Sequence, residues 1–412
     1  CRMNHLTAPK GWSQPLLGSG LAPWAGLRAA VAAGPHAVLA ALDAAQLHCH
    51  RDGGASVASS WRATAATKGE TRYAVAHAYE SDPALFTTRL LLEQNAQAVV
   101  EGLAIAAFTV GAREAIVALR ADDEQGARAI ETVIANGVRE GAFGSIALRV
   151  RALQGSSMIG ESTVLMKALD GKRGQPEQTP PYPSTVGYLG KPTAVTRAAT
   201  LAAVPWILVH GAAEYAAIGD PAEPGTMLVQ IGGAVGTPGV LEVPTGTILA
   251  DIVAAAGGAA TSATLKALLV GGPAGGFIPA QLLAATPYSN AGLLTVGARI
   301  GSGAVLALDT SVEIPELAAT LTRWSADEAC GKTIPCRIGT RRLAEIGQRF
   351  VDGLAGPADA ARLQTLAADI ADSALCVHEA QASTPLLSGM RYFEHEFLGD
   401  AVSVESTRIG RS

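Results

Sequence analysis

Apolar residues in the first 153 positions follow two different spacings. Short apolar runs typical of strands alternate with longer stretches in which apolar residues recur every three or four positions, as on one face of a helix. Such alternation is typical of a mostly parallel sheet covered by helices, so the pattern predicts an α/β domain. The predicted strands are 73–76, 114–119 and 146–153, and the predicted helices are 26–42, 91–110 and 124–140.

The pattern changes twice in the second half of the chain. Between 227 and 243, short apolar runs are broken by Gly and Pro, and a helix at 247–256 and a strand at 267–270 follow. This arrangement predicts a small α+β module. After residue 313 the spacing is helical and predicts a helical bundle. The bundle helices are expected at 317–324, 341–354, 358–375 and 386–396.

Bulk composition excludes several classes of protein. With 412 residues the chain is long enough for two or three domains, and its net charge of −5 leaves no broad basic surface for nucleic acid. The longest apolar stretch, 193–211, is interrupted by Arg197, Pro205 and His210, so a membrane span is not expected. The five widely spaced cysteines do not form a disulfide pattern, which predicts a reducing compartment.

Three of these cysteines suggest an iron–sulfur locus. A Cys-x-x-Cys-x-x-Cys loop gives three thiolates to one cluster, but in this loop Thr333 stands between Cys330 and Cys336. A hydroxyl stays protonated near neutral pH and is a poor iron ligand, whereas Cys376 is available farther along the chain. We expect the three thiols to lie close together, either as an empty pocket of inert buried thiols or as ligands of a three-thiolate cluster.

The residues around this locus resemble those of a known family. Its members read E-S-C-G-x-C-x-P-C-R-x-G-T where this chain reads E-A-C-G-K-T-I-P-C-R-I-G-T, and they share P-x-L-S-x-x-R-Y-F at 385–393. The chain is similar to the NADH-oxidising flavoprotein subunit of respiratory complex I and to the diaphorase subunits of NAD-linked hydrogenases and formate dehydrogenases. The other similar stretches are 90–101, 160–165, 171–183, 190–201 and 271–279.

The resemblance implies a domain order and a set of partners. It implies a flavin/NADH-type α/β domain at 1–225, a ubiquitin-like (soluble-ligand-binding β-grasp) module at 226–312 and a helical iron–sulfur-type bundle at 313–412. The implied partners are a thioredoxin-like 2Fe–2S subunit and a larger catalytic subunit of the same complex, without nucleic acid or a direct membrane span. The implied location is the cytoplasm, or the cytoplasmic or matrix side of a membrane complex.

The loop that holds flavin phosphate in the family is altered here. Backbone N–H groups of a glycine-rich loop bind phosphate, and the family sequence is G-R-G-G-A-G-F-P-T-G-x-K-W. This chain keeps Gly53, Gly54 and Ala55 in that loop, has Asp52 where the family has Arg, and lacks the third Gly, the Phe, the Pro and the Lys. A carboxylate and a phosphate are both negatively charged, so the two groups repel each other.

Other family positions that contact flavin and NADH are also changed. His77 and Tyr79 stand where the family has Asn and Asp, Ser162 replaces a Glu, and Thr196 and Arg197 replace a pair of Asn. We therefore predict that FMN is absent or weakly held, with its phosphate near Arg197 if it binds, and assign no catalytic residue. The candidate cofactor-binding residues are Gly53, Gly54, Ala55, Glu80, Gly160, Glu161, Thr196 and Arg197, and the candidate metal ligands are Cys330, Cys336 and Cys376.

Two functions follow from these residues. The favoured hypothesis is a degenerate structural or docking paralogue within an NAD(H)-linked electron-transfer complex, with weak or no FMN and NADH binding and a doubtful iron–sulfur cluster. The alternative is a working NADH:acceptor oxidoreductase subunit that passes electrons from NADH through FMN to a 4Fe–4S cluster. His48 and His50 flank Cys49 in a pattern that resembles a metal site. A fourth ligand at suitable spacing is absent, so the pattern is interpreted as coincidence.

Overall fold

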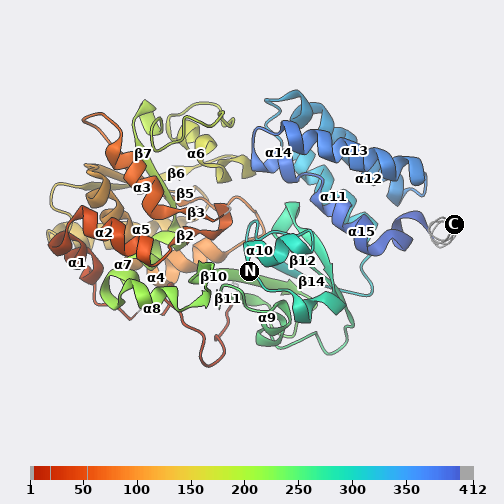
Figure 1. Cartoon of the computed structure of the whole chain (residues 1–412), viewed down its shortest axis with the longest axis horizontal. Helices are drawn as coiled ribbons and strands as arrows, with labels where there is room; N and C mark the ends of the chain where they lie inside the picture. The colour runs from red at the N-terminus through yellow and green to blue at the C-terminus, as the bar shows by residue number, and fades with distance from the viewer. Residues whose placement is uncertain (1–3, 19, 53, 400–412) are drawn as a thin grey trace. The chain divides into compact units, whose positions relative to one another are not determined.

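A computed structural model describes residues 4–18, 20–52 and 54–399 of the chain (Figure 1). The chain divides into two compact units. The first comprises Cys1–Gln230, Gly239–Thr247 and Tyr288–Asn290, and the second comprises Ile231–Pro238, Ile248–Pro287 and Ala291–Ser412.

The first unit is built on a four-stranded parallel sheet. Its strand order is β6-β5-β4-β7, and β4 is buried at every position, as expected for a strand covered on both faces. The register places Tyr73 of β4 opposite Thr193 of β7, and His77 opposite Arg197. The strands are β4 (Tyr73–Ala78), β5 (Glu114–Arg120), β6 (Ala147–Leu153) and β7 (Thr193–Arg197).

Helices and short strands complete the first unit. The helices are α1 (Ala25–Ala33), α2 (Pro35–Ala44), α3 (Val57–Ala66), α4 (Thr87–Val110), α5 (Glu124–Arg139), α6 (Ser162–Leu169), α7 (Ala198–His210) and α8 (Ala212–Ala216). The short strands are β1 (Asn4–His5), β2 (His48–Cys49), β3 (Ala55–Ser56), β8 (Gly219–Asp220), β9 (Glu223–Pro224) and β11 (Gly239–Pro244), and β10 (Thr226–Gly233) starts here. The α/β domain predicted from the alternating pattern is confirmed.

Strand order fixes where a ligand site is expected in this sheet. The chain runs from β4 outward through β5 to β6, then returns to place β7 on the other side of β4. In open parallel sheets, ligands bind in the crevice beyond the carboxyl ends of the strands at the point where the strand order reverses. That point lies between the ends of β4 and β7, and the helix that follows β7 begins there.

Close backbone contacts hold the helices of the first unit together. A Cβ atom at Gly102 of α4 would lie 2.1 Å from the carbonyl oxygen of Leu201 in α7. A Cβ at Gly26 of α1 would lie 2.6 Å from the Cα of Pro205, also in α7. Both α4 and α1 therefore approach the backbone of α7 at positions that only glycine can occupy.

Replacing Gly102 by Ala should destabilise the protein by about 1–3 kcal/mol, because the added methyl group overlaps backbone atoms that cannot rotate away. In an exposed helix the same substitution would stabilise the protein by up to ~1 kcal/mol. The sign of the change in the free energy of unfolding therefore distinguishes an effect of packing from an effect of helix propensity. Urea unfolding followed by circular dichroism measures the difference. An unchanged or increased free energy of unfolding would contradict the packing described for Gly102.

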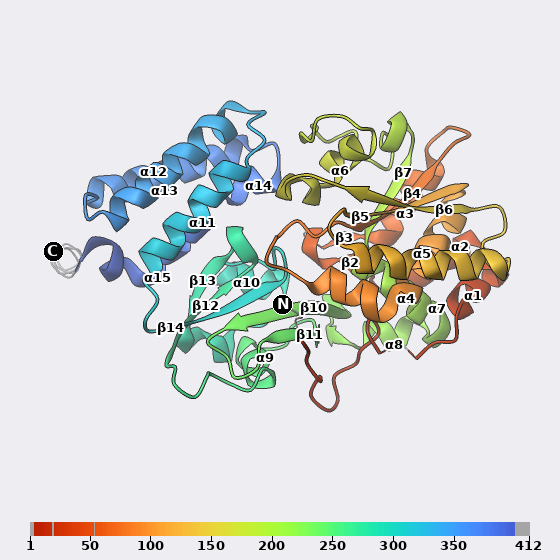
Figure 2. The same ribbon diagram turned by 180° about the vertical axis from the view of Figure 1, so that it is seen from behind.

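The second unit contains antiparallel strands and the C-terminal helices. Strand β12 (Leu265–Val270) pairs with β13 (Gly276–Pro279) and β14 (Ala304–Asp309), as Figure 2 shows. Helix α11 packs against α12 and α15, and α13 packs against α12. The helices are α9 (Leu249–Ala255), α10 (Asn290–Thr295), α11 (Ile314–Glu328), α12 (Thr340–Val351), α13 (Pro357–Ser373), α14 (Val377–Gln381) and α15 (Thr384–Leu398).

Two features of the first unit differ from the sequence predictions. The single helix predicted at 26–42 is wrong: Gly34 adopts φ +85°, Pro35 starts a new helix, and the axes of α1 and α2 differ by 114°. The strand β7 and the helix α7 were not predicted, since 193–211 was considered only as an apolar run. Among the described residues no single helix could cross a membrane, although α1 and α2 together have the length and composition.

Candidate functional site

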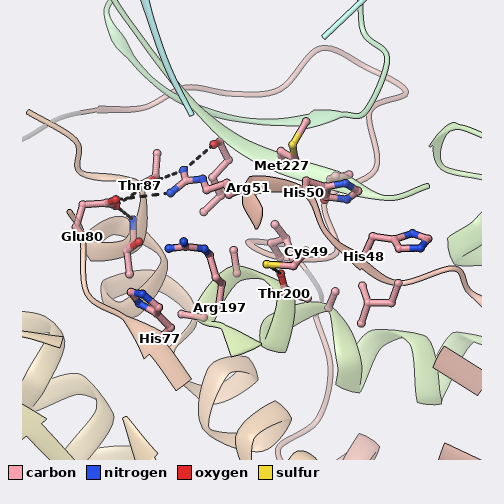
Figure 3. A pocket seen from close by; sticks show the side chains of 18 of the residues that line it. His48, Cys49, His50, Arg51, His77, Glu80, Thr87, Arg197, Thr200 and Met227 are labelled. Atoms are coloured by element: carbon pink, nitrogen blue, oxygen red, sulfur yellow. Dashed lines mark hydrogen bonds and ion pairs between the residues drawn. The ribbon is translucent and has the colours of Figure 1, made fainter. Parts of the chain in front are cut away.

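A pocket lies where the strand order of the first unit predicts a ligand site. It is lined by the carboxyl ends of β4 and β7, the first residues of α4 and α7, and the segment around β2. Figure 3 shows the side chains that point into it. Those lining residues that carry polar or sulfur groups are His48, Cys49, His50, Arg51, His77, Tyr79, Glu80, Thr87, Thr88, Arg197, Thr200, Tyr215, Thr226 and Met227.

Arg51 and Glu80 form an ion pair at one side of this pocket. An Arg51 Nη1 atom lies 3.6 Å from Glu80 Oε1, and Nη2 donates to Thr87 Oγ1 at 2.9 Å. Glu80 Oε2 accepts hydrogen bonds from the Thr87 hydroxyl and from the backbone N–H of Thr88, both at 3.1 Å. Glu80 therefore caps the first turn of α4 and neutralises Arg51, so both its oxygens have partners within the protein.

His77 and Arg197 converge on a single carbonyl group. As cross-strand neighbours in β4 and β7, their side chains emerge at the same edge of the sheet. His77 Nε2 donates to Gly160 O at 3.1 Å, and Arg197 Nη2 donates to the same oxygen at 3.0 Å. Gly160 cannot carry a side chain, because a Cβ would lie 2.6 Å from the Cβ of Ser81.

Several candidate residues lie outside the pocket lining. Glu161 is the N-cap of α6 and accepts from the N–H of Val164 at 2.9 Å. The Thr196 hydroxyl accepts from Nε1 of the fully buried Trp61 at 2.9 Å. Gly54 has φ +78° and Ala55 belongs to β3, whereas Gly53 lies outside the described residues. Of the candidate cofactor-binding residues that the structure describes, only Glu80 and Arg197 line the pocket.

Two basic residues of this pocket, Arg51 and His50, are not among the candidate cofactor-binding residues predicted from the sequence. His50 is buried, and its Nδ1 lies 4.0 Å from Glu223 Oε2. Burial lowers the pKa of His50 to about 4, so this imidazole is neutral near neutral pH. Their position directly before Gly53-Gly54 in the sequence was the signal that could have identified them.

The cysteine locus lies in the second unit. Cys330 precedes a single π-helical turn, Pro335–Gly339, that contains Cys336, and Cys376 is the N-cap residue of α14. Burial raises the pKa of Cys336, and the neighbouring Cys330 acts in the same direction. Burial raises the pKa of Cys376 to about 11, and the neighbouring charges of Cys336, Glu379 and Cys330 act in the same direction. Burial therefore favours the protonated thiol at both Cys336 and Cys376, and the neighbouring thiols act in the same direction.

Thr333 faces a buried carboxylate at this locus. Its hydroxyl donates to Glu379 Oε1 at 2.6 Å and accepts from the N–H of Cys336 at 3.1 Å. Glu379 is 1% exposed, and its other oxygen accepts from the N–H of Leu375 at 3.0 Å. Within the described residues, no group of three or more His, Cys, Asp or Glu side chains is arranged to hold a metal ion.

Comparisons with known proteins match both units. The family described as the Nuo51 FMN-binding domain matches residues 49–206, and the NADH-ubiquinone oxidoreductase-F iron-sulfur binding region matches 316–399. An SLBB domain matches 228–278. The NADP-reducing hydrogenase subunit HndC of Solidesulfovibrio fructosivorans is 33% identical over 347 residues, which cover 82% of this chain and 70% of the relative. The chain belongs to the family of the complex I flavoprotein subunit and the hydrogenase diaphorase subunits.

Other relatives agree with that assignment. A subunit of the NADH-quinone oxidoreductase of Escherichia coli (strain K12) is 32% identical over 84% of this chain and 80% of its own length. A crystal structure of an NAD+-reducing [NiFe]-hydrogenase in the H2-reduced state superposes with a TM-score of 0.84 at 29% identity, covering 97% of this chain and 71% of that chain. The resemblance to the complex I flavoprotein subunit and to hydrogenase diaphorase subunits is confirmed.

Proposed function

We propose that this chain is a structural and docking subunit of an NAD(H)-linked electron-transfer complex, with weak or no binding of FMN and NADH. One observation supports this most directly: His77 and Arg197 both donate to the chain's own Gly160 carbonyl. The family has Asn residues at these positions, and the Asn that His77 replaces hydrogen-bonds the flavin. In this proposal His77 and Arg197 make internal hydrogen bonds at positions where the family resemblance implies a cofactor site.

A flavin would have to compete with these bonds. A hydrogen bond to a charged group contributes about 1.5–3 kcal/mol and a neutral one about 0.5–1.5 kcal/mol. A flavin ring that displaced His77 and Arg197 would remove both of these hydrogen-bond donors from the Gly160 carbonyl. Glu80 is already paired with Arg51 and hydrogen-bonded to the N–H of Thr88. The residues present do not make a complete flavin site, so no hydride transfer is assigned to them.

The proposal includes three domains and two kinds of partner. We place the flavin-type α/β domain at 1–225, the ubiquitin-like module at 226–312 and the iron–sulfur-type helical bundle at 313–412. The SLBB match at 228–278 and the helices from Ile314 to Leu398 support these boundaries. Relatives named as subunits of a hydrogenase and of a quinone oxidoreductase support partners of two kinds, a thioredoxin-like 2Fe–2S subunit and a larger catalytic subunit.

One observation favours the alternative of a working NADH:acceptor oxidoreductase. Arg51 and Arg197 point into the same pocket, as Figure 3 shows, and Arg197 is the N-cap residue of α7. A guanidinium group at a helix N-terminus, with a second Arg lining the same pocket, is suited to a phosphate. In that alternative the FMN phosphate lies near Arg197.

Flavin content decides between the two. We expect the purified chain to show no absorption band near ~450 nm, to release less than about 0.1 FMN per chain on acid treatment, and to have no NADH:ferricyanide activity. The double variant His77→Asn, Arg197→Asn removes both donors from Gly160 and should bind FMN about tenfold more tightly, equivalent to ~1.4 kcal/mol.

The matched control is Arg128→Asn on the exposed face of α5, which should not change FMN binding. Stoichiometric FMN in the wild-type chain, together with NADH:ferricyanide activity, would support the working enzyme and reject the docking role. An FMN affinity unchanged in the double variant would show that the Gly160 contacts do not exclude the flavin.

A further inference from the structure

The cysteine locus offers three thiols where a cluster needs four ligands. In a 4Fe–4S cluster with only cysteine ligands, each iron is held by one thiolate. The matched iron–sulfur region, 316–399, contains Cys330, Cys336 and Cys376 and no other cysteine. The hydroxyl of Thr333, which occupies the remaining loop position, is bonded to Glu379.

The bonds of Thr333 and Glu379 join two segments far apart in the sequence. Glu379 accepts from Thr333 through one oxygen and from the N–H of Leu375 through the other. Thr333 in turn accepts from the N–H of Cys336, whose carbonyl accepts from the Thr340 hydroxyl at 2.6 Å. A continuous set of hydrogen bonds therefore links the cysteine loop to the junction of α13 and α14.

A cluster would link the same two segments. Its ligands would come from Cys330 and Cys336 on the loop and from Cys376 beside Leu375. A buried carboxylate is unfavourable next to thiolates that already carry negative charge, because like charges repel strongly away from water. Glu379 is 1% exposed, so solvent does not screen it. The donor set therefore does not fit a 4Fe–4S cluster.

We infer that the Thr333–Glu379 hydrogen-bonded pair has replaced the iron–sulfur cluster as the link between the cysteine loop and the α13–α14 junction. The helical region 314–398 then keeps its fold without metal, and the locus contributes to structure instead of electron transfer. This inference rests on contacts within the second unit, so it does not depend on whether the pocket of the first unit binds FMN.

Thermal unfolding tests the structural part of the inference. The wild-type chain should unfold at the same temperature with and without a strong iron and zinc chelator. Glu379→Ala and Thr333→Val each remove the pair and should lower Tm by at least about 4 °C. Thr333→Ser keeps the hydroxyl and should stay within about 1 °C of wild type. Glu345→Ala, an exposed site on α12, is the matched control and should not change Tm.

Iron content tests the replacement of the cluster. After anaerobic reconstitution with ferrous iron and sulfide, the wild-type chain should bind no stoichiometric cluster. The double variant Thr333→Cys, Glu379→Ala supplies a fourth thiolate and removes the carboxylate, so it should bind about four iron and four sulfide ions per chain. Thr333→Cys alone keeps Glu379 and should bind less than half as much.

Three results would overturn the inference. A stoichiometric metal in the wild-type chain, or a Tm that falls when the chelator is added, would show that the locus still depends on metal. A Tm unchanged in both Thr333→Val and Glu379→Ala would show that the pair does not stabilise the fold. If Glu379→Ala does not fold, the comparison of Thr333→Val with Thr333→Ser still gives the answer.

Discussion

Replacing Glu101 by Ala is expected to lower the free energy of unfolding by about 3–5 kcal/mol. Glu101 lies in the middle of α4 and is 2% exposed. Its carboxylate accepts from the backbone N–H groups of Trp24 at 3.0 Å and Leu27 at 2.9 Å. Helix α1 has no side-chain N-cap of its own, so a residue 77 positions away supplies acceptors for its first turn.

The size of the effect follows from what remains after truncation. Two buried N–H groups would lose their acceptor, and each unsatisfied group costs about 1–3 kcal/mol. Glu101→Gln keeps one carbonyl oxygen and should fall between wild type and Ala. The control is Glu124→Ala at an exposed position of α5, which should change stability by less than about 0.5 kcal/mol. Urea unfolding measures all three, and a Glu101→Ala loss below about 1 kcal/mol would contradict the capping role.

The contacts of Glu101 are of a kind that the sequence alone does not predict. The apolar spacing predicted α4, because helical period is a local property, but a Glu within that stretch gives no sign of which distant N–H groups it caps. The same limit applies to Thr333 and Glu379, which are bonded across 46 residues. In contrast, the break between α1 and α2 could have been predicted, since Gly34-Pro35 is a local signal.

The candidate site was predictable only in part for the same reason. Resemblance to the family identified Glu80 and Arg197, and the structure places both in the pocket. It gave no reason to expect that His77 and Arg197 share Gly160, since that contact depends on the register of β4 with β7. Long-range register and carbonyl positions follow from the assembled sheet and are not encoded in any one segment.

A second large effect is expected in the pH dependence of stability, from two buried groups with opposite signs. Glu242 in β11 is fully buried, and its Oε1 and Oε2 accept from the N–H groups of Leu16 and Leu17, both at 2.9 Å. Burial raises its pKa from 4.5 to about 7, although its hydrogen bonds act in the opposite direction. Between pH 4.5 and 7 the unfolded chain has lost this proton and the folded chain keeps it. Stability therefore falls as pH rises, by about 3 kcal/mol over that range.

His50 acts in the opposite direction over an overlapping range. Burial lowers its pKa from 6.5 to about 4, only partly offset by the charge of Glu223. Below pH 6.5 the unfolded chain binds a proton that the folded chain does not, so stability falls as pH drops toward 4. The integrated loss is again about 3 kcal/mol. Above pH 6.5 His50 is neutral in both states and its contribution is constant.

Between pH 4.5 and 6.5 the two contributions should cancel, and single variants should reveal each one. Glu242→Gln leaves His50 alone, so stability should rise with pH by about 1.4 kcal/mol per unit relative to wild type. His50→Asn leaves Glu242 alone, and stability should fall with pH at a similar rate. The controls are Glu124→Gln and His36→Asn at exposed positions, which should leave the profile unchanged. Urea unfolding at half-unit steps from pH 4.5 to 7 gives the slopes; two variants with the same slope as wild type would show that neither group is buried in the protonation state assigned to it.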